Sequence, residues 1–385
     1  LRHVKKMVPS YRFANSKTFR GALKAGAQEK LDKVELGYAD IAYLQYTGGT
    51  TGVSKGAMLS HRNMVYNVHQ TIVWQGDAYA GVEPLIAITA LPLYHIFSLE
   101  GNCLTVMAQG GQNVLIPNPR DFEGFAKEIA RYEFNLFTGV NTMFSALMQA
   151  ENFDNIDFSH MRVCIGGGMA VQPAVEKEWK EKTGSTILQG YGLTETSPVA
   201  ICCKIDSEFN GSIGLPVPST DVMIADDDGN ALPLGEVGEI CIKGPQVMEG
   251  YWQRPEETAK VMLPGGWLRT GDVGRMDEGG YVWIEDRKKD MILVSGFNVY
   301  PNEIENVVVE IDGILEAAAI GIPDERAGEV VKIFAVRTND TITEQVVLDY
   351  CKENLTGYKR PRAVEFRDEL PKTNVGKILR RALRE

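Results

Sequence analysis

A regular alternation of short apolar runs with amphipathic stretches, from Tyr38 to about Gly214, is the feature that most constrains the fold. The apolar runs indicate buried strands at 85–91, 113–116, 135–140, 162–165 and 186–189. The amphipathic stretches indicate helices at 121–132, 142–150 and 171–183, the first with Asp121 as its N-cap. Strands and helices that alternate at this spacing predict an α/β fold with a layered body and a largely parallel sheet. Ligands bind such sheets at the carboxyl ends of the strands.

The pattern changes twice further along the chain. From Ile213 to Asp286, turn residues separate short strands at 222–225, 239–243 and 281–285, which predicts a small β-barrel-like subdomain. From about Lys288 a compact unit follows, with strands at 291–294, 317–322, 331–336 and 363–366 and helices near 301–310 and before Leu355. Thr341 and Glu344 have capping-box spacing for the second of these helices. We therefore expect three parts: 1–212 within a large α/β domain, 213–286 as a β-rich subdomain, and 287–385 as a separate C-terminal α+β domain.

The composition is that of an ordinary soluble globular protein and argues against several function classes. The 385 residues are 44% hydrophobic and 24% charged, and the net charge of −11 argues against nucleic acid as a partner. The six cysteines lack the spacing of a disulfide framework or a zinc site. The longest apolar stretch, 85–107, is interrupted by Pro92, His95 and Glu100 and is unsuited to span a membrane. With no signal-peptide pattern at its start, the chain is expected in the cytoplasm.

A glycine- and threonine-rich stretch at 46–56 is the strongest local sign of a binding site. It follows the apolar run 41–46, which predicts a buried strand, and precedes Ser60 and Asn63, which indicate a helix start. Its glycines let backbone N–H groups approach an anion, its hydroxyls add donors, and Lys55 adds a positive charge. Because glycine follows Lys55 where serine or threonine is required, this is not a Walker A loop. By itself the stretch fits a phosphate-binding loop and a plain surface turn equally well.

Three further clusters carry residue types suited to nucleotide chemistry. Tyr191, in a glycine-rich turn, offers an aromatic plate for a purine, and Glu195 offers a carboxylate for Mg²⁺. Asp272 is able to accept hydrogen bonds from two neighbouring hydroxyls, as in ribose recognition. The run 286–290 places five charges at the expected border of the C-terminal domain. Each cluster alone is also explained without a ligand, as a turn with a solvated or self-capping carboxylate or as a solvated linker.

The order and spacing of these clusters resemble those of the motifs in the adenylate-forming superfamily. This superfamily includes acyl-CoA synthetases, peptide-synthetase adenylation domains and firefly luciferase. The motifs that carry the resemblance span nearly the whole chain, at 46–56, 190–195, 267–272, 286–290 and 371–377. Within the superfamily the chain is most similar to the bacterial long-chain fatty-acid–CoA ligases, with supporting stretches at 91–97, 139–142, 214–220 and 295–301. Five ordered motifs with one shared explanation outweigh the separate ligand-free interpretations.

The resemblance implies a two-step reaction that uses ATP and Mg²⁺. A fatty-acid carboxylate attacks the α-phosphorus of ATP to give acyl-AMP and pyrophosphate, and the thiol of coenzyme A then displaces AMP. Nucleotidyl transfer depends on positioning and on neutralising negative charge, which suits the glycines, hydroxyls and lysines seen here. A luciferase-like oxidoreductase, a peptide-synthetase adenylation domain and an inactive binding remnant remain alternatives. Coenzyme-A-dependent product formation without oxygen uptake distinguishes a ligase from the first of these.

The resemblance also assigns roles position by position. Lys377 is implied to bridge the attacking carboxylate and the α-phosphate, and Glu195 to bind Mg²⁺; Thr47 and Lys55 complete the implied catalytic set. The phosphates are implied to contact Thr47, Gly48, Gly49, Thr50, Thr51, Gly52 and Lys55. The AMP part is implied to contact Gly166, Gly167, Gly168, Gly190, Tyr191, Gly192, Thr194, Asp272 and Arg287, the last two at the ribose.

Two further roles concern movement and the acyl group. Lys289 occupies the position of a hinge, about which a mobile C-terminal domain turns between the half-reactions. His95 and Gly139 would border the acyl channel, although an ordinary packed histidine explains His95 as well.

Departures from the family pattern leave details open. The chain begins at Leu1 without methionine, whereas family members carry a further N-terminal subdomain, so we expect that a preceding portion is missing. Gly265 stands where Asp or Asn is usual and Met276 where Trp is frequent, which leaves the preferred acyl chain length undetermined. The expected partners are small molecules: fatty acid, ATP and coenzyme A. Peripheral contact with the inner membrane and a homodimer stay open.

Overall fold

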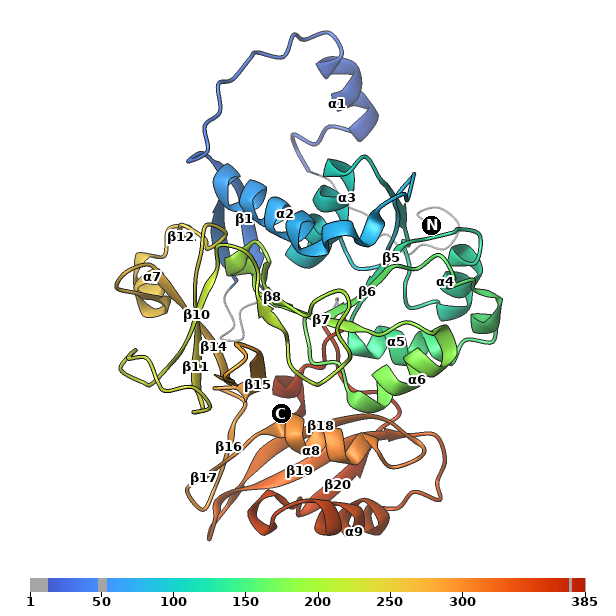
Figure 1. Ribbon diagram of the computed structural model, residues 1–385, viewed down its shortest axis with the longest axis vertical. Coiled ribbons are helices and arrows are strands. Elements are labelled where there is room, and N and C mark those ends of the chain that lie inside the picture. Colours follow the sequence, from blue (N-terminus) through green and yellow to red (C-terminus); the bar gives the residue numbers. More distant parts are fainter. Residues whose placement is uncertain (1–12, 48–53, 374–375, 385) are drawn as a thin grey trace. The chain divides into compact units, whose positions relative to one another are not determined.

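The computed structural model describes residues 13–47, 54–373 and 376–384 (Figure 1). The chain forms two compact units, Leu1–Tyr38 and Ala39–Glu385. The described part of the first unit contains helix α1 (Phe19–Gly26), whose N-cap Thr18 accepts a hydrogen bond from the backbone N–H of Gly21. All other elements belong to the second unit.

The largest sheet of the second unit has seven strands (Figure 1). Its first five strands are parallel neighbours, in the order β4 (Gln112–Leu115), β3 (Ile86–Thr89), β5 (Leu136–Gly139), β6 (Val163–Gly167) and β7 (Leu188–Gly192). Two antiparallel strands complete the sheet: β8 (Val199–Cys202) and β9 (Leu215–Pro216). The observed strands overlap the apolar runs, and the predicted α/β fold with a largely parallel sheet is confirmed.

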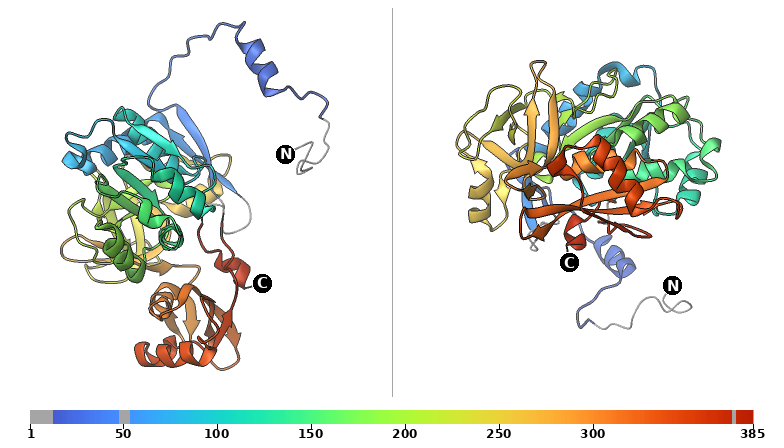
Figure 2. Two further views of the ribbon diagram at one scale, coloured as in Figure 1. Left: turned by 90° about the vertical axis from the view of Figure 1, so that its right-hand side faces the viewer. Right: turned by 90° about the horizontal axis from the view of Figure 1, so that it is seen from below.

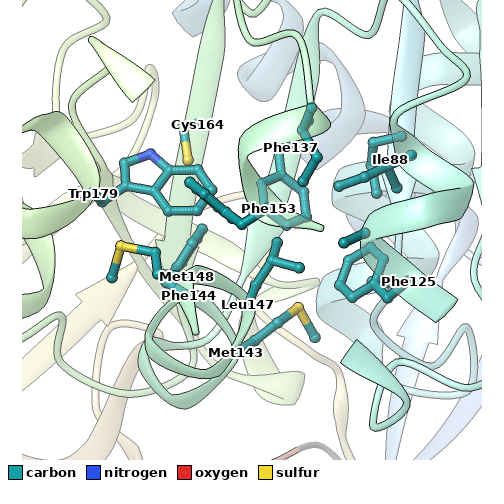
Figure 3. Packing of buried hydrophobic residues seen from close by; sticks show 14 of the residues in the cluster. Ile88, Phe125, Phe137, Met143, Phe144, Leu147, Met148, Phe153, Cys164 and Trp179 are labelled. Atoms are coloured by element: carbon teal, nitrogen blue, oxygen red, sulfur yellow. The ribbon is translucent and has the colours of Figure 1, made fainter. Parts of the chain in front are cut away.

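The helices that connect these strands bury an aromatic cluster (Figure 3). The helices are α4 (Phe122–Ile129), α5 (Asn141–Met148) and α6 (Pro173–Thr183). Phe144 of α5 meets the fully buried Trp179 of α6 edge to face, with ring centroids 5.0 Å apart, and Phe137 of β5 lies 5.6 Å from Phe144. Each such ring contributes roughly 1.5–3 kcal/mol by leaving water. As predicted, Asp121 caps α4 by accepting from the N–H of Gly124.

Helix α2 (His61–Gln75) begins where the sequence indicated. The Ser60 side chain accepts from the N–H of Asn63, and Asn63 Oδ1 accepts from the N–H of Ser60, so the two residues form a capping box. The remaining short helical elements of the α/β part include one π-helix, η2 (Phe97–Leu104). The others are η1 (Gly76–Tyr79), α3 (Thr105–Ala108), η3 (Phe153–Asn155) and η4 (Thr194–Thr196).

A separate antiparallel sheet corrects two expectations about the glycine-rich stretch. It comprises β1 (Ile41–Thr47), β2 (Lys55–Ser60) and β12 (Gly250–Tyr251), with β2 in the middle. Strand β1 is not buried: Leu44 is 40% and Tyr46 59% exposed, because β1 is an edge strand that pairs with β2 alone among the described strands. The stretch therefore connects two antiparallel strands, and β2 separates it from the helix that starts after Ser60.

The β-rich part is a five-stranded antiparallel sheet. Its strands are β10 (Asp221–Ala225), β11 (Gly238–Lys243), β14 (Trp267–Met276), β13 (Met262–Leu263) and β15 (Val282–Arg287), with β15 beside β14, and helix α7 (Pro255–Val261) precedes β13. The observed pairings leave this sheet open, so within the described residues it is not a closed barrel.

The C-terminal stretch has a sheet of its own (Figure 2). It also has its own cluster of buried hydrophobic residues. Its strands are β16 (Ile292–Val294), β17 (Phe297–Val299), β18 (Ile314–Asp324), β19 (Gly328–Arg337) and β20 (Ala363–Phe366). Its helices are α8 (Pro301–Val309), α9 (Glu344–Asn354), η5 (Gly357–Lys359) and η6 (Arg380–Leu383). Pro301 occupies the first turn of α8. Thr343, and not Thr341 as the capping-box spacing indicated, caps α9 by accepting from the N–H of Val346.

None of the helices in the described ranges is long and apolar enough to cross a bilayer.

Candidate active site

Glycines at the carboxyl ends of β6 and β7 make room for side chains from distant segments. Gly166 and Gly167 end β6, where Gly167 pairs with Gly190 of β7. Gly168 follows with φ 77°, a conformation that favours glycine. A Cβ at Gly168 would lie 2.9 Å from Lys377 Cε, and one at Gly167 would lie 3.0 Å from the Phe97 ring. Both side chains therefore approach the strand end only because no side chain stands there.

Lys377 belongs to a hairpin that contacts the α/β part. Its N–H donates to Thr373 Oγ1 at 3.2 Å and its carbonyl accepts from the N–H of Thr373 at 2.8 Å. The hairpin is held at Thr142, whose hydroxyl donates to the carbonyl of Gly376 at 3.0 Å. Burial, with a smaller contribution from the nearby Arg287 charge, lowers the pKa of Lys377 to about 8. The ammonium is thus largely protonated at pH 7 and poorly hydrated, a state that favours contact with an anion.

Asp272 lies at the centre of a second contact set. Tyr191 Oη donates to Asp272 Oδ2 at 2.7 Å, and Arg287 Nε lies 3.5 Å from Asp272 Oδ1. Asp272 and Arg287 are cross-strand partners in β14 and β15, which explains why motifs fifteen residues apart meet. Burial, with the Asp272 charge as the next cause, raises the pKa of Tyr191 well above its ordinary value, so the phenol stays a donor.

His95 and Gly139 differ in what surrounds them. Burial, and secondarily the charge of Lys377, lowers the pKa of His95 to about 4, so the imidazole is neutral at pH 7. Its Nδ1 accepts from the N–H of Phe97 at 3.3 Å. Gly139 ends β5, and a Cβ there would lie 2.9 Å from Phe144 Cζ, so the space beside it is filled by that ring. Their assignment to an acyl channel stays a prediction.

A second cluster gathers around Tyr251 of β12. Tyr251 Oη donates to Glu195 Oε1 at 2.6 Å, and Lys55 Nζ lies 5.0 Å from the centroid of the tyrosine ring. Lys55 is also paired with Glu257 of α7, with Nζ 2.5 Å from Oε2. A cavity of about 280 Å³ adjoins the cluster, lined by residues that include Glu195, Tyr251, Lys260, Arg269 and Lys288. Sequence reasoning missed Tyr251 and Glu257, because no motif spacing connects either of them with its partner.

The donor set at Glu195 fits a magnesium ion shared with phosphates. The Tyr251 hydroxyl engages one carboxylate oxygen, Oε1, and Mg²⁺ is usually bound by one or two carboxylates together with substrate phosphates and water. In the part of the chain that the structure describes, no three His, Cys, Asp or Glu side chains gather into a protein-only metal site.

The remaining predicted residues fall into three groups. Gly48, Gly49, Thr50, Thr51 and Gly52 lie outside the described residues. Thr47 ends β1 opposite Lys55, Thr194 begins η4, and Gly192 ends β7, where a Cβ would overlap the carbonyl of Pro198. Lys289 lies in the turn between β15 and β16, where burial, followed by the Arg287 charge, lowers its pKa to about 8.

Comparison with known protein families and relatives identifies two family matches. Residues 3–252 match the AMP-binding enzymes, and residues 303–377 match the AMP-binding enzyme C-terminal domain. The long-chain-fatty-acid–CoA ligase of Escherichia coli O6:H1 is 53% identical over 386 residues, which cover 100% of this chain and 68% of that protein. The enzyme of the same name from Bacillus subtilis (strain 168) is 41% identical and is covered to 66%.

Solved structures agree with this assignment. ATP-bound MatB from Rhodopseudomonas palustris superimposes with a TM-score of 0.85 at 34% identity, over 94% of this chain and 72% of that one. The apo structure of MatB gives a TM-score of 0.74 over the same shares. The chain belongs to the AMP-binding enzyme family and is, like the long-chain-fatty-acid–CoA ligases of Escherichia coli and Bacillus subtilis, an adenylate-forming acid–thiol ligase.

Proposed function

We propose that the chain is a long-chain fatty-acid–CoA ligase. It would activate the carboxylate of a long-chain fatty acid with ATP and then transfer the acyl group to the thiol of coenzyme A, in the cytoplasm. Relatives named long-chain-fatty-acid–CoA ligase, at 53% and 41% identity, support this substrate class. The observation that carries the chemistry is the position of the Lys377 side chain against Gly168, where the charges of Arg287 and Asp272 act on it.

In the first half-reaction, a carboxylate oxygen of the fatty acid attacks the α-phosphorus, and the bond from that phosphorus to pyrophosphate breaks. We assign to Lys377 the stabilisation of the charge that develops there, because a preorganised cation with little water around it acts more strongly than a solvated one. Asp272 would accept from the ribose hydroxyls beside Arg287. The glycine ends of β6 and β7, with Tyr191 and Thr194, would border the AMP part.

The residues around Tyr251 are suited to bind the β- and γ-phosphates, which leave as pyrophosphate. Lys55 and Thr47 would contact the β- and γ-phosphates. Glu195, through Oε2, which has no hydrogen-bond partner among the residues that the structure describes, would hold Mg²⁺, and the ion would neutralise part of the phosphate charge. Support comes from the proximity of Lys55 and Glu195 to one side chain, Tyr251.

In the second half-reaction, the sulfur of coenzyme A attacks the acyl carbonyl carbon, and the bond from that carbon to the AMP oxygen breaks. We propose that residues 287–385 act as a domain that turns about Lys289 between the two steps, while 1–212 and 213–286 form the larger partner. The separate hydrophobic cluster of the C-terminal sheet supports this division.

The test has two stages. Oleate should drive exchange of labelled pyrophosphate into ATP, and addition of coenzyme A should then give oleoyl-CoA in equal amounts with AMP. A panel of acetate, laurate, palmitate, oleate and ferulate defines the substrate class, the last because a feruloyl-CoA synthase is 38% identical. Exchange with ferulate or acetate, but with no long-chain acid, would contradict the proposed substrate. No exchange with any acid would contradict the proposed activity of the chain.

A further inference from the structure

Arg380, three residues beyond Lys377, is the centre of a buried polar cluster. Its side chain is only 15% exposed. Nε and Nη2 donate to the two carboxylate oxygens of Glu305 at 2.9 and 2.7 Å, and Nη2 also donates to Asn302 Oδ1 at 2.7 Å. Nη1 lies 3.5 Å from Asp286 Oδ1 and 3.6 Å from Asp290 Oδ2. A two-pronged contact of this kind fixes the direction of the guanidinium as well as its position.

The acceptors around Arg380 are themselves held. Glu305, on α8, also accepts from the N–H of Ala319 in β18 at 2.8 Å. Asp286, in β15, is 1% exposed and accepts from the N–H groups of Arg287 at 2.7 Å and Asn302 at 2.8 Å. The cluster therefore joins the last strand before Lys289 to the helix that follows it. Arg380 anchors the end of the chain at the junction between these two elements.

The short chain from Arg380 to Lys377 limits where Lys377 can lie. Three residues span at most about 10 Å when fully extended. The base of the hairpin is closed by the N–H of Leu379, which donates to the carbonyl of Pro371 at 2.8 Å. On its far side the hairpin is held to Thr142 through the carbonyl of Gly376. Lys377 therefore lies between two points at which the hairpin is held. One is the hydrogen bond from Thr142, and the other is Arg380, which contacts Asp290 in the linker after Lys289.

We propose that Arg380 is a positioning residue for adenylation: it holds the terminal hairpin so that the Lys377 ammonium stays over Gly168. The inference rests on the role proposed above for Lys377. Arginine is required because its planar fork meets carboxylates from α8 and the linker at once, whereas a lysine ammonium offers a single point charge. If Arg380 merely stabilised the C-terminal sheet, its loss would affect both half-reactions and leave the environment of Lys377 unchanged.

The first experiment separates the two half-reactions in Arg380→Met and Arg380→Lys. We expect Arg380→Met to slow oleate-driven pyrophosphate exchange by roughly 10–100-fold in kcat, because small misplacements of a catalytic group have effects of this size. The KM for ATP and the rate of thioester formation from preformed oleoyl-AMP should stay within about threefold of the unsubstituted chain. Arg380→Lys should lie between the two. Equal losses in both half-reactions would overturn the proposal.

A matched control breaks another ion pair of the same helix. Lys359 Nζ donates to both carboxylate oxygens of Glu303, each at 2.7 Å, and so attaches η5 to α8 without touching the Lys377 hairpin. Lys359→Met should leave the ratio of the two half-reaction rates unchanged. A shift of that ratio equal to the shift in Arg380→Met would show that any weakening of α8 suffices, and would overturn a specific role for Arg380.

The second experiment measures the pKa of the Lys377 amine, which depends on its surroundings, and needs no catalytic turnover. The rate at which acetic anhydride acetylates Lys377, followed by mass spectrometry against pH, gives the apparent pKa of its amine. We expect about 8 in the unsubstituted chain and in Lys359→Met, and a rise toward the ordinary 10.5 in Arg380→Met as the amine enters water. An unchanged value in both Arg380 variants would overturn the proposal. Because this readout needs no turnover, it also separates failure of the positioning role from failure of the proposed function.

Discussion

Lys377 combines a positive charge with a largely dehydrated position, the combination that its proposed role in adenylation uses. Replacement by alanine removes one preorganised charge-stabilising donor, so we expect Lys377→Ala to slow fatty-acid-dependent pyrophosphate exchange by roughly 10²–10³-fold. Thioester formation from preformed acyl-AMP should change far less. Both rates are measurable by rapid quench with labelled nucleotide or acyl-AMP.

A lysine on the same hairpin provides the control. Lys372 Nζ lies 2.6 Å from Glu316 Oε1, so Lys372→Ala removes an equal charge from a position engaged with a protein carboxylate. It should leave pyrophosphate exchange within about threefold. Equal losses of both half-reactions in Lys377→Ala would contradict the assigned role.

Lys55 is engaged by a carboxylate that a nucleotide would have to compete with. Glu257 accepts from Lys260 and from Lys55, and these contacts, the one with Lys260 first, lower its pKa to about 2, so it is ionised at neutral pH. Removing this charge relieves the repulsion that a phosphate bound beside Lys55 would meet, although water screens much of it. We expect Glu257→Gln to lower the KM for MgATP by roughly twofold to fivefold, with the difference shrinking in high salt.

The adjacent Glu256 allows the specific effect to be separated from net charge. It lies on the same helix and is exposed, and Glu256→Gln makes the same change in charge. We expect at most half the effect from it. A higher KM in Glu257→Gln would mean that the carboxylate orients Lys55 for binding and does not compete with phosphate.

The sequence reveals only part of this site, for a physical reason. The meeting of Tyr191, Asp272 and Arg287 was expected from the resemblance, which assigns all three to the AMP part, whereas the strand that carries Asp272, β14, was not predicted. The contacts of Tyr251 were not foreseeable, because they depend on the pairing of β12 with β2 opposite Ala57, almost two hundred residues away. Long-range strand pairing of this kind leaves no local pattern.

At the scale of elements, the predicted strands and helix starts agree with the structure where one local sequence signal, an apolar run or an N-cap residue, was sufficient. Apolar runs predicted the parallel strands, including β4 at the sheet edge, where Leu115 is exposed. The capping residues Ser60 and Asp121 predicted the starts of α2 and α4. The strand from Ile41 was expected to be buried but lies at a sheet edge, since an apolar run has the same appearance in both places. β2 was missed because its sequence, KGAMLS, has neither alternation nor β-branched residues.

The π-helix η2 contains a buried carboxyl group that the proposed chemistry does not use. Glu100 is fully buried; its Oε1 accepts from Thr105 Oγ1 at 3.3 Å, while Oε2 has no hydrogen-bond partner among the described residues. Burial raises the pKa of Glu100 to about 8 from its ordinary 4.5, opposed by the Thr105 hydrogen bond, so the folded protein binds this proton at neutral pH. The wider π-helical turn thus carries a neutral acid within the body of the protein.

The titration of Glu100 gives a stability prediction whose sign is fixed. Between about pH 5 and 8 the folded state keeps the proton and the unfolded state has lost it, so stability from this group falls as pH rises, by at most about 1.4 kcal/mol per pH unit. Glu100→Gln lacks this loss. Its free energy of unfolding in urea, relative to the unsubstituted chain, should therefore be more favourable at pH 8 than at pH 6. A difference that does not change with pH would contradict a buried, protonated Glu100.

At the scale of the whole molecule, the linker between β15 and β16 has contacts that belong to each side. Before Lys289, the N–H of Lys288 donates to the carbonyl of Gly271 at 3.0 Å, and Lys288 Nζ donates to Asp227 at 2.6 Å. After it, Asp290 lies beside Arg380.

The proposed rotation about the linker would require Lys289 to change its backbone dihedrals, and proline would prevent this by fixing φ near −65°. The N–H of Lys289 donates no hydrogen bond within the described residues, so Lys289→Pro removes none there. We expect pyrophosphate exchange within about threefold of normal, and thioester formation from preformed acyl-AMP slowed by about 10²-fold or more because the second arrangement is not reached. Lys289→Ala, which keeps φ free, should support both half-reactions. Survival of both steps in the proline variant would place the pivot elsewhere, whereas loss of exchange alone would show that the first arrangement had been distorted.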